Sequence, residues 1–482
     1  MSAWFFYLAL FKYLALVVHI VSFDVLYTST STPRAPNIQP NDCTVIIPIE
    51  DPENPVFAEC LQSCLTNEPA LIMIVTTGEE VTVAMKKAVA RYQQQYTHTK
   101  ISVKTSSHTG RRNQIAYGLE YAKTKITILM DEHVAWPSAR FLPALIAPFE
   151  DRRVGIVGTN KRARRTDGNY IFNALGAMEL ERQCFDERGA NAIDGGVFIV
   201  SDLTSAHRTR IVTEDSFLDA LTNKRFFFGT FAPLSTDADS FITRWTLACG
   251  YSAKIQSSSD ACIETVLPPN YIARCIEQSR TSWRTSFAYL FSIGPRLWTH
   301  PWSFYALHLS SVFNLALLYD GVLIYTLSTS PMARELNALS YLIRWMLVTK
   351  LAKLIPYFVS HPQDLLMLPA VLAFGYIHSL IKIYAGLTFF ITTTDPNTRK
   401  IYPEPSGWSS ASASGSGSKA AVRSRSRIRG DDWDSPGGNL SPPQPRGRGR
   451  PRSETPLQSV EEDVYASPGK RGAKPRGRPK KK

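Results

Sequence analysis

The sequence has few of the features that stabilise small disulfide-rich or zinc-binding domains. Its seven cysteines form no CxxC pair and show no regular spacing; they lie at positions 43, 60, 64, 184, 249, 262 and 275. Structural zinc sites often use such pairs, and disulfide frameworks belong mainly to secreted domains. We therefore expect reduced thiols in a domain that faces the cytosol. The sequence also shows no internal repeat, which argues against a repeat architecture.

The end of the chain, residues 403–482, has almost no aliphatic residues and is rich in Ser, Gly, Pro and Arg. It cannot bury enough apolar surface to offset the entropy lost on ordering, so we predict a disordered basic tail. This tail holds 17 Lys and Arg against 8 Asp and Glu, so it carries nine of the net charge of +13. The rest of the chain is only mildly basic.

The first apolar run, residues 4–23, lacks both a basic start and a small-residue cleavage site. It is long enough to cross a bilayer. We predict that residues 1–30 form an uncleaved N-terminal membrane anchor. Lys12 and His19 fall inside this run, so each must face protein, snorkel or lie near a boundary.

A second apolar region leads to a predicted domain of interfacial and transmembrane helices at 286–395. The strong candidate spans are 304–327 and 365–391. The stretch between them, 341–359, carries Arg344, Lys350 and Lys353, so it either crosses, re-enters or lies in the interface as an amphipathic helix. The number of spans is left open by the sequence.

Residues 40–285 alternate short β-branched runs with segments of helical periodicity. Strands are predicted at 43–49, 70–78, 100–106 and 125–130, and helices at 56–65, 79–94 and 112–123. This alternation indicates an α/β domain with a parallel sheet and helices on both faces. Ligands of such sheets bind at the carboxyl ends of the strands. The triplet Asp131-Glu132-His133 follows a strand directly, so it is either a ligand-binding segment or a solvated turn.

Three stretches carry a family resemblance: "TVIIPIEDPENPVFAECLQSCL", "SSHTGRRNQIAYGLEYAKTKITILMDEHVAWP" and "DADSFITRW", in this order and followed by apolar helices. Over about residues 40–395, the chain resembles the membrane-bound family 2 glycosyltransferases, and most closely the fungal polysaccharide synthases related to hyaluronan, chitin and cellulose synthases. The resemblance implies a Rossmann-like GT-A catalytic domain in the cytosol. It further implies inverting transfer of a sugar from a nucleotide-diphosphate donor, expected to be a UDP-sugar, to a glycan acceptor.

The same resemblance assigns donor and metal roles. Asp131 would face the nucleotide, and Asp131, Glu132 and His133 would supply ligands for Mg²⁺ or Mn²⁺, which suits hard oxygen donors with one nitrogen. The basic pair Arg111 and Arg112 would approach the diphosphate, although two arginines opening a helix are also common at surfaces. Pro48, Glu50 and Glu53 would frame the nucleoside. The segment 75–80, "VTTGEE", lacks the Asp that many relatives use to contact the base.

The general base has two candidates. Thr213-Glu214-Asp215 spells the "TED" form of cellulose synthases, but the residues after it do not continue that pattern. Asp237 and Asp239, followed by "SFITRW", match the family segment better, and the spacing favours Asp239. A carboxylate here would take the proton of the acceptor hydroxyl. The alternative role of Asp239 is a helix N-cap.

The acceptor side departs from the family. Gly195 and Gly196 match a small-residue segment near the acceptor, although a tight turn would need the same residues. Where processive relatives carry QxxRW, this chain has Arg274, Glu277 and Gln278; Arg280 and Trp283 follow. Glu in place of Arg puts negative charge near a diphosphate unless Arg274 or Arg280 compensates. This departure argues against processive synthesis.

Three hypotheses follow. The first is an active, diverged glycosyltransferase, and the second is a catalytically degenerate GT-A membrane protein with a binding or scaffolding role. The third is DNA binding, because 445–452 and 474–482 resemble AT-hooks. We do not expect nucleic acid as a partner, since polybasic segments beside a bilayer bind anionic membrane lipid through the same charge. The distribution of Lys and Arg favours a cytosolic body and tail on a plasma or secretory membrane.

Overall fold

The computed structural model describes residues 2–49, 54–165, 170–201, 203–223, 238–267, 270–291, 299–313, 315–334 and 337–391. By its internal contacts the chain divides into Met1–Pro442 and Pro443–Lys482. The predicted tail at 403–482 lies outside the described residues. So do Glu50, Glu53 and Asp237, and the predictions for them are not tested by the structure.

The first half of the sheet is built as the sequence predicts. Strand β1 (Cys43–Pro48) pairs in parallel with β2 (Leu71–Thr77) and with β4 (Ile126–Met130), and β2 pairs in parallel with β3 (Lys100–Ser106). The connecting helices are α2 (Pro55–Thr66), α3 (Glu79–Gln95) and α4 (Arg111–Glu120). Every residue of β1 is buried, as expected for a central parallel strand covered on both faces.

The second half of the sheet is mixed, whereas the alternation of elements predicted a parallel sheet. The strand order is β3-β2-β1-β4-β7-β6-β9-β5, with β8 also paired to β6. Strand β7 (Thr204–Arg208) is antiparallel to both β4 and β6 (Val154–Arg164). Strand β6 runs parallel to β8 (Ser252–Gln256) and β9 (Cys262–Val266), and β5 (Val134–Ala135) is antiparallel to β9.

Helices also close the edges and faces of this second half. They are α5 (Phe141–Ile146), α7 (Thr209–Val212), α8 (Asp215–Asn223) and α9 (Ala238–Ala248). Helix α9 packs on β6 and β8, and α8 packs on α4. The N-terminal end of α9 is thereby brought to the edge where β4 ends.

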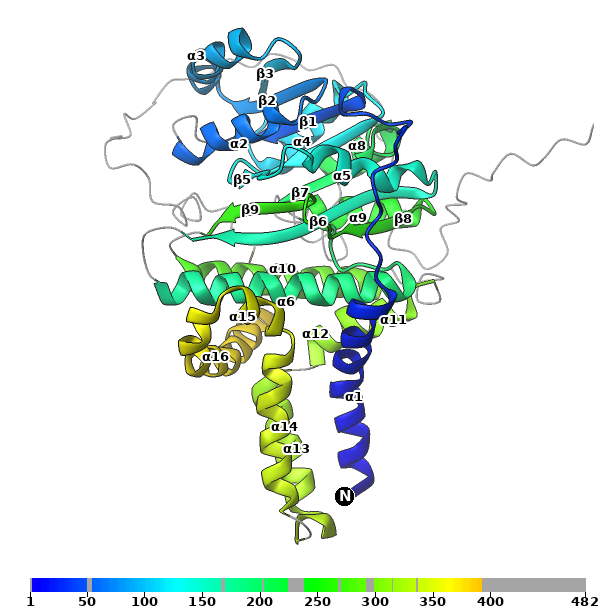
Figure 1. Cartoon of the computed structure of the whole chain (residues 1–482), viewed down its shortest axis with the longest axis vertical. Coiled ribbons are helices and arrows are strands. Elements are labelled where there is room, and N and C mark those ends of the chain that lie inside the picture. Colours follow the sequence, from blue (N-terminus) through cyan, green and yellow to red (C-terminus); the bar gives the residue numbers. More distant parts are fainter. Residues whose placement is uncertain are drawn as a thin grey trace, which may run out of the picture. The chain divides into compact units, whose positions relative to one another are not determined.

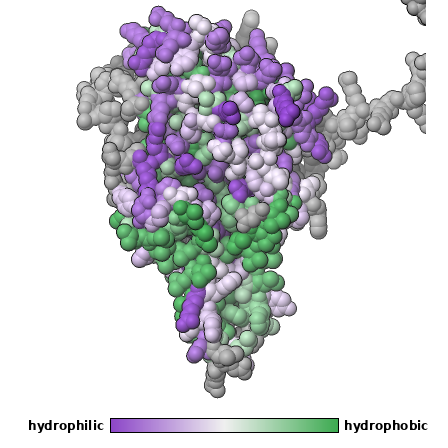
Figure 2. Space-filling model, viewed as in Figure 1, coloured by the Kyte–Doolittle hydropathy of each residue, from purple (hydrophilic) through white to green (hydrophobic). Residues whose placement is uncertain are grey.

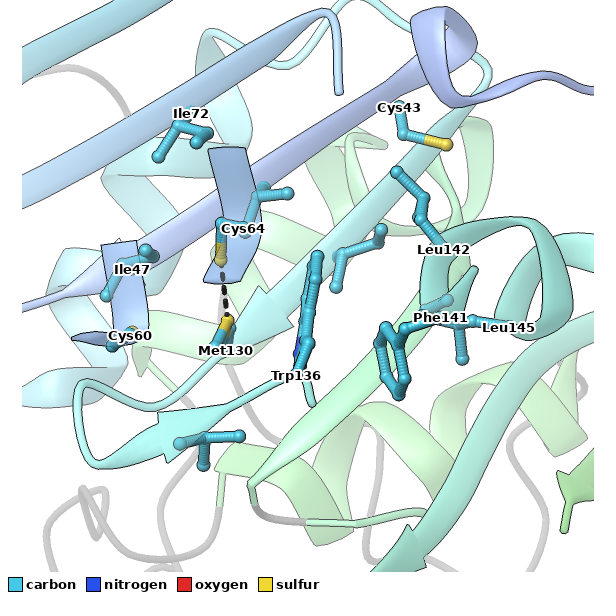
Figure 3. Packing of buried hydrophobic residues seen from close by; sticks show 14 of the residues in the cluster. Cys43, Ile47, Cys60, Cys64, Ile72, Met130, Trp136, Phe141, Leu142 and Leu145 are labelled. Carbon is cyan, nitrogen blue, oxygen red and sulfur yellow. Dashed lines mark hydrogen bonds between the residues drawn. The ribbon is translucent and has the colours of Figure 1, made fainter. Parts of the chain in front are cut away.

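A hydrophobic core lies between α2 and the end of β4 (Figure 3). Cys64 points to Met130, with the two sulfur atoms 3.1 Å apart, and the Trp136 ring stacks on Phe141 at a centroid distance of 4.6 Å. Contact with Cys64, together with burial, raises the pKa of the Cys60 thiol, so this thiol stays neutral. The end of β4 is therefore packed against α2.

Two long helices, α6 (Tyr170–Asp194) and α10 (Tyr271–Phe291), run beneath the sheet (Figure 1). Below them, α1 (Ser2–Val21), α13 (Ala316–Ser328) and α14 (Ala338–Ala352) lie side by side and point away from the sheet. Helix α16 (Leu368–Leu387) instead packs along α10. The connecting helices are α11 (Pro301–Ser303), α12 (Ser310–Phe313) and α15 (Ile355–Ser360), with a π-helical turn at Phe304–Leu309.

Two described helices are long and apolar enough to cross a membrane, by length and composition: Ala3–Val21 and Pro362–Leu387. Helix α13, within the predicted span 304–327, has 13 residues and is shorter than a bilayer needs. Figure 2 shows hydrophobic residues gathering over these lower helices, while the half that carries the sheet is mostly hydrophilic on this face. The distribution of hydropathy thus separates two regions of the molecule.

Candidate active site

Arg111 joins two carboxylates that lie 108 positions apart in the sequence. Asp131 follows the last residue of β4, and Arg111 opens α4 after Gly110, whose φ of +99° favours glycine. One nitrogen of the Arg111 guanidinium lies 3.1 Å from Asp131 Oδ2 and another lies 3.8 Å from Asp239 Oδ2. The backbone N–H of Asp131 donates to the Leu203 carbonyl at 2.9 Å. Two sequence-predicted groups thus meet at one basic side chain.

Arg112, the second residue of the basic pair, is placed differently. Its side chain is 6% exposed, donates from Nε to the Leu221 carbonyl and lies over the Phe241 ring at 5.3 Å. It does not line the cavity described below, whereas Arg111 does. In this structure Arg112 connects α4 to α8 and α9, and Arg111 alone faces the site.

Glu132 and His133 lie beside Asp131 in the turn that leads to β5. His133 Nε2 is 3.6 Å from Glu132 Oε1, and its Nδ1 is 3.0 Å from the Asn54 side-chain nitrogen at the start of α2. Within the described ranges no three His, Cys, Asp or Glu side chains form a group that could hold a metal by themselves. Carboxylates with one imidazole do fit Mg²⁺ or Mn²⁺ when phosphate oxygens complete the ligand set.

Asp239 lies in the first turn of α9 and is 8% exposed. The Thr243 hydroxyl, one turn later, donates to the Asp239 carbonyl at 2.8 Å and accepts from the Val200 N–H at 3.1 Å, which fixes the start of the helix. The rival carboxylates Glu214 and Asp215 are exposed and do not line the cavity. The geometry therefore favours Asp239 over the "TED" segment.

A cavity of about 700 Å³ connects these residues with the helices beneath the sheet. Its volume lies in the range of ordinary ligand pockets. At the sheet end it is lined by Arg111, Asp131, His133, Leu203, Asp239 and Ser240. It continues between α6 and α10, and its far end is lined by residues of α1, α13, α14 and α16. Pro48, at the end of β1, is buried and lies outside the lining.

The predicted acceptor residues are dispersed. Arg274 lines the cavity, and its guanidinium makes no hydrogen bond or ion pair within the described part of the chain. Gly195 and Gly196 form a turn instead: Gly195 has φ of +74°, and the Gly196 N–H donates to the Asp194 carboxylate at 2.9 Å. That carboxylate also accepts from the Ser303 N–H at 2.8 Å, so the turn joins α6 to α11.

Glu277 is neutralised by two arginines of its own helix. Its carboxylate oxygens lie 3.0 Å from Arg284 and 3.3 Å from Arg280. Arg284 is 1% exposed and donates also to the Phe389 and Ile391 carbonyls, at 2.9 and 3.0 Å. The carboxylate expected to repel a diphosphate does line the cavity, but it is paired with two arginines that hold the end of α16.

Trp283 and Arg280 also contact α16. The Trp283 indole N–H donates to the Lys382 carbonyl at 2.9 Å, and the ring lies where a Cβ on Gly386 would fall. Arg280 donates to the Thr388 hydroxyl at 3.1 Å. Neither residue lines the cavity. In this structure both attach α10 to α16.

No site role follows from the sequence for the lysines of the lower helices. Lys12, Lys350, Lys353 and Lys382 all line the far end of the cavity. The signal was present, since each interrupts an apolar run, where a charge commonly marks a functional position. The sequence could not show that α1, α14 with its C-cap residue Lys353, and α16 bring these lysines to one cavity.

Comparisons with known proteins agree with this geometry. The family model for "Glycosyltransferase like family 2" matches residues 40–285. A type 2 glycosyltransferase of Pyricularia oryzae is 31% identical over 420 residues, covering 83% of this chain and 84% of that protein. One of Gibberella zeae is 31% identical over 394 residues, covering 79% and 73%.

Among solved structures, the mannosyltransferase PcManGT from Pyrobaculum calidifontis, in complex with GDP-Man and Mn²⁺, has a TM-score of 0.52 to this chain. Its sequence identity is 17%, and the match covers 81% of this chain and 99% of that one. At this identity the likeness shows the fold, and the sequence relatives show the family. The chain belongs to glycosyltransferase family 2 and is a glycosyltransferase with a GT-A fold.

Proposed function

We propose that this glycosyltransferase is membrane-bound and inverts the anomeric centre while moving a sugar to a hydroxyl of a glycan acceptor. The observation that carries the proposal is the position of Arg111 between Asp131 and Asp239 in one cavity. A donor diphosphate would compete with these carboxylates for the Arg111 guanidinium, which binds phosphate oxygens in a bidentate way. Donor binding would thereby release Asp239 to act on the acceptor.

In the proposed reaction, the acceptor oxygen attacks the anomeric carbon from the face opposite the diphosphate. The proton of the acceptor hydroxyl passes to Asp239, and the bond from the anomeric carbon to the nucleoside diphosphate breaks. Burial of Asp239 at the start of α9 limits competition from water for this proton. Asp237 is a second candidate for the same role from the sequence pattern alone. A UDP-sugar is the expected donor.

A divalent cation would be held by Asp131 with Glu132 or His133, and by phosphate oxygens of the donor. When bound, Mg²⁺ or Mn²⁺ would neutralise the negative charge that develops on the leaving diphosphate. PcManGT, which shares the fold, contains Mn²⁺ with its GDP-Man. The role of Asn54 would be to orient the His133 ring, which it meets at 3.0 Å.

The membrane part of the proposal rests on helix composition. Helix α1 and the stretch Pro362–Leu387 are long and apolar enough to span or enter a bilayer. Exposed large apolar side chains recur on α13, α14 and α16, as on a surface that faces lipid. We propose a cytosolic catalytic domain and tail, on a plasma or secretory membrane, with the basic tail attracted to anionic lipid.

The degenerate, non-catalytic alternative loses one of its supports. It rested on Glu277 repelling a diphosphate where relatives carry Arg. Because Glu277 is paired with Arg280 and Arg284, its charge is compensated inside the α10–α16 contact. Processive synthesis still lacks the stacking Trp of QxxRW, so we propose transfer of few sugars.

The test is release of nucleoside diphosphate from a panel of nucleotide sugars by the detergent-purified full-length protein, with Mn²⁺ or Mg²⁺ and with chelator. Release that requires the metal, Asp131 and Asp239 supports the proposal and identifies the donor. Asp131→Asn and Asp239→Asn are the test variants. The matched control is Asp215→Asn, which changes an exposed carboxylate outside the cavity. Release that survives both test variants but fails in the control would move the base to the "TED" segment.

A further inference from the structure

The far end of the cavity lies between helices of the lower region and is rich in cations. Three ion pairs involve its lining lysines: Lys12 and Lys350 pair with Asp320, the latter at 2.9 Å, and Lys353 pairs with Asp186 at 2.6 Å. Asp320 is 3% exposed and receives a further hydrogen bond at 3.2 Å from the Tyr376 hydroxyl. One carboxylate thus serves two lysines, which leaves one positive charge over at this point.

Lys382 adds a charge that has no partner of its own. Its ammonium group lines the cavity and makes no hydrogen bond or ion pair with the described residues. The nearby carboxylate of Glu179 pairs with Arg182 at 3.7 Å, and Asp186 pairs with Lys353. The Trp283 bond to the Lys382 carbonyl fixes the backbone of α16 at this position. The backbone from which the Lys382 side chain reaches the cavity wall is therefore fixed.

Around this end and the adjoining turns of α6, five cations face three carboxylates. The cations are Lys12, Arg182, Lys350, Lys353 and Lys382, and the carboxylates are Glu179, Asp186 and Asp320. Two further lining carboxylates, Glu187 and Glu277, are paired with Lys161 and with Arg280 and Arg284, so they do not remove the excess. Uncompensated charge away from bulk water is costly unless a counter-charge is bound. A bound anion would supply that charge, and a phosphate is the common anion with enough oxygens to meet several ammonium groups.

The walls around these cations indicate an amphiphile rather than a free glycan. Apolar side chains of Leu16, Leu307 and Ala316 line the same end. Large apolar residues are exposed on the outer faces of α13, α14 and α16, next to this end. An acyl or isoprenoid chain could leave the cavity between these helices.

We propose that the acceptor is carried on a phosphate-bearing membrane lipid, and that the cavity wall at Lys382, with Lys350 and Lys353, binds the lipid phosphate. This inference rests on the proposed function: the acceptor hydroxyl on the lipid or its glycan faces Asp239, while the phosphate is held at the other end of one cavity. The phosphate itself takes no part in bond making. It sets which acceptors reach the catalytic carboxylate.

The test is equilibrium binding of lipids to the full-length protein in detergent, without donor, so that catalysis plays no part. The probes are phosphatidylinositol, phosphatidylglycerol and farnesyl phosphate, with phosphatidylcholine as the lipid without net charge. We expect saturable binding of the anionic lipids, weakened about tenfold by Lys382→Gln, the loss expected for one charge-assisted hydrogen bond. Lys382→Arg should restore binding, and Lys87→Gln, an exposed lysine of α3, should leave it unchanged.

Three results would overturn the inference. One is equal binding of phosphatidylcholine, another is binding that Lys382→Gln leaves unaltered, and the third is competition by free inorganic phosphate as strong as that of the lipids. Metal-dependent binding of nucleoside diphosphate is measured on the same samples. If it persists while lipid binding fails, only this inference falls; if it fails while lipid binding persists, the proposed function falls instead.

Discussion

The donor end of the cavity, where the strands of the sheet end, and helix α10 beneath the sheet differ in how closely they follow the family pattern. At the donor end, Arg111, Asp131 and Asp239 meet within salt-bridge distance, as the motifs imply. On helix α10, the QxxRW residues are replaced, and Glu277 with Arg284 attaches α10 to the end of α16. The comparison teaches that charged residues at the motif position of α10 can serve to attach this helix to its neighbour.

The largest effect is expected from the carboxylate proposed as base. Asp239→Asn should lower kcat about 10²–10⁴-fold, the usual contribution of general base catalysis, because the amide cannot take the proton. The donor KM should change little, since Arg111 and Asp131 remain. Steady-state nucleoside diphosphate release measures both constants. A fall in donor affinity with kcat intact would assign Asp239 to binding.

A large effect on donor binding is expected from Arg111, the cation between the two carboxylates. Arg111→Met should weaken donor binding about 10–100-fold, because a charged hydrogen-bonding group is lost to the diphosphate. It should also leave Asp131 and Asp239 facing each other without a counter-charge. Calorimetric titration with nucleoside diphosphate and Mn²⁺ checks this. Arg91→Met, on the exposed face of α3, is the control.

On the acceptor side the main effect should be on stability. Arg284→Met should cost about 1–3 kcal/mol, because it leaves the Phe389 and Ile391 carbonyls without their donor and Glu277 with Arg280 alone. Arg280 would still meet Glu277 and reduce the loss. Thermal unfolding in detergent measures the change, with the exposed Arg153→Met as control. An unchanged Tm would show that the Arg284 cluster does not hold α16.

Restoring the family motif on α10 tests the difference between the two regions more sharply. Arg274→Gln, Glu277→Arg and Gln278→Trp together recreate the QxxRW residues that processive relatives carry, but they set three arginines together around the end of α16. We expect a lower Tm and no longer products, judged by product length on a gel. Longer products from a stable variant would contradict the structural role of Glu277.

The smallest expected effect is a difference in reactivity among the cysteine thiols. Burial raises the pKa of Cys184 to about 12 and that of Cys275 to about 11, so both stay protonated at pH 8. All seven cysteines are free, and Cys249 is the one that is not buried. Iodoacetamide should label Cys249 first in the native protein. Mass spectrometry of the labelled peptides measures the order of reaction. Rapid labelling of Cys60 would contradict this expectation, because it would show that the core beside Asp131 opens to solvent.

Much of the donor half could be predicted from the sequence, because its signals are local. Strands β1 to β4 and helices α2 to α4 follow directly from periodicity, and Asp131 falls at a strand end. The reversal of β7 could not be predicted, since strand direction depends on partners far away in the chain. For the same reason Arg112 and Trp283 looked like site residues, while their tertiary contacts turn them to Leu221 and Gly386.

The lower region was harder to predict because hydropathy does not show which helices extend together. The run 365–391 has the composition of a span, yet α16 lies along α10 through the contacts of Trp283 and Arg280. In the sequence, the lysines of this region stood out only as charges that interrupt apolar runs. Their meeting in one cavity depends on packing between α1, α14 and α16, which no local pattern records.

The most direct measurement is an electron cryo-microscopy structure of the full-length protein in a lipid nanodisc with nucleoside diphosphate and Mn²⁺. The account predicts that the diphosphate contacts Arg111, that the cation lies at Asp131 with Glu132 or His133, and that Asp239 faces the position of the missing sugar. A nucleotide bound away from Arg111 and Asp131, or a site where Asp239 turns out of the cavity, would contradict it.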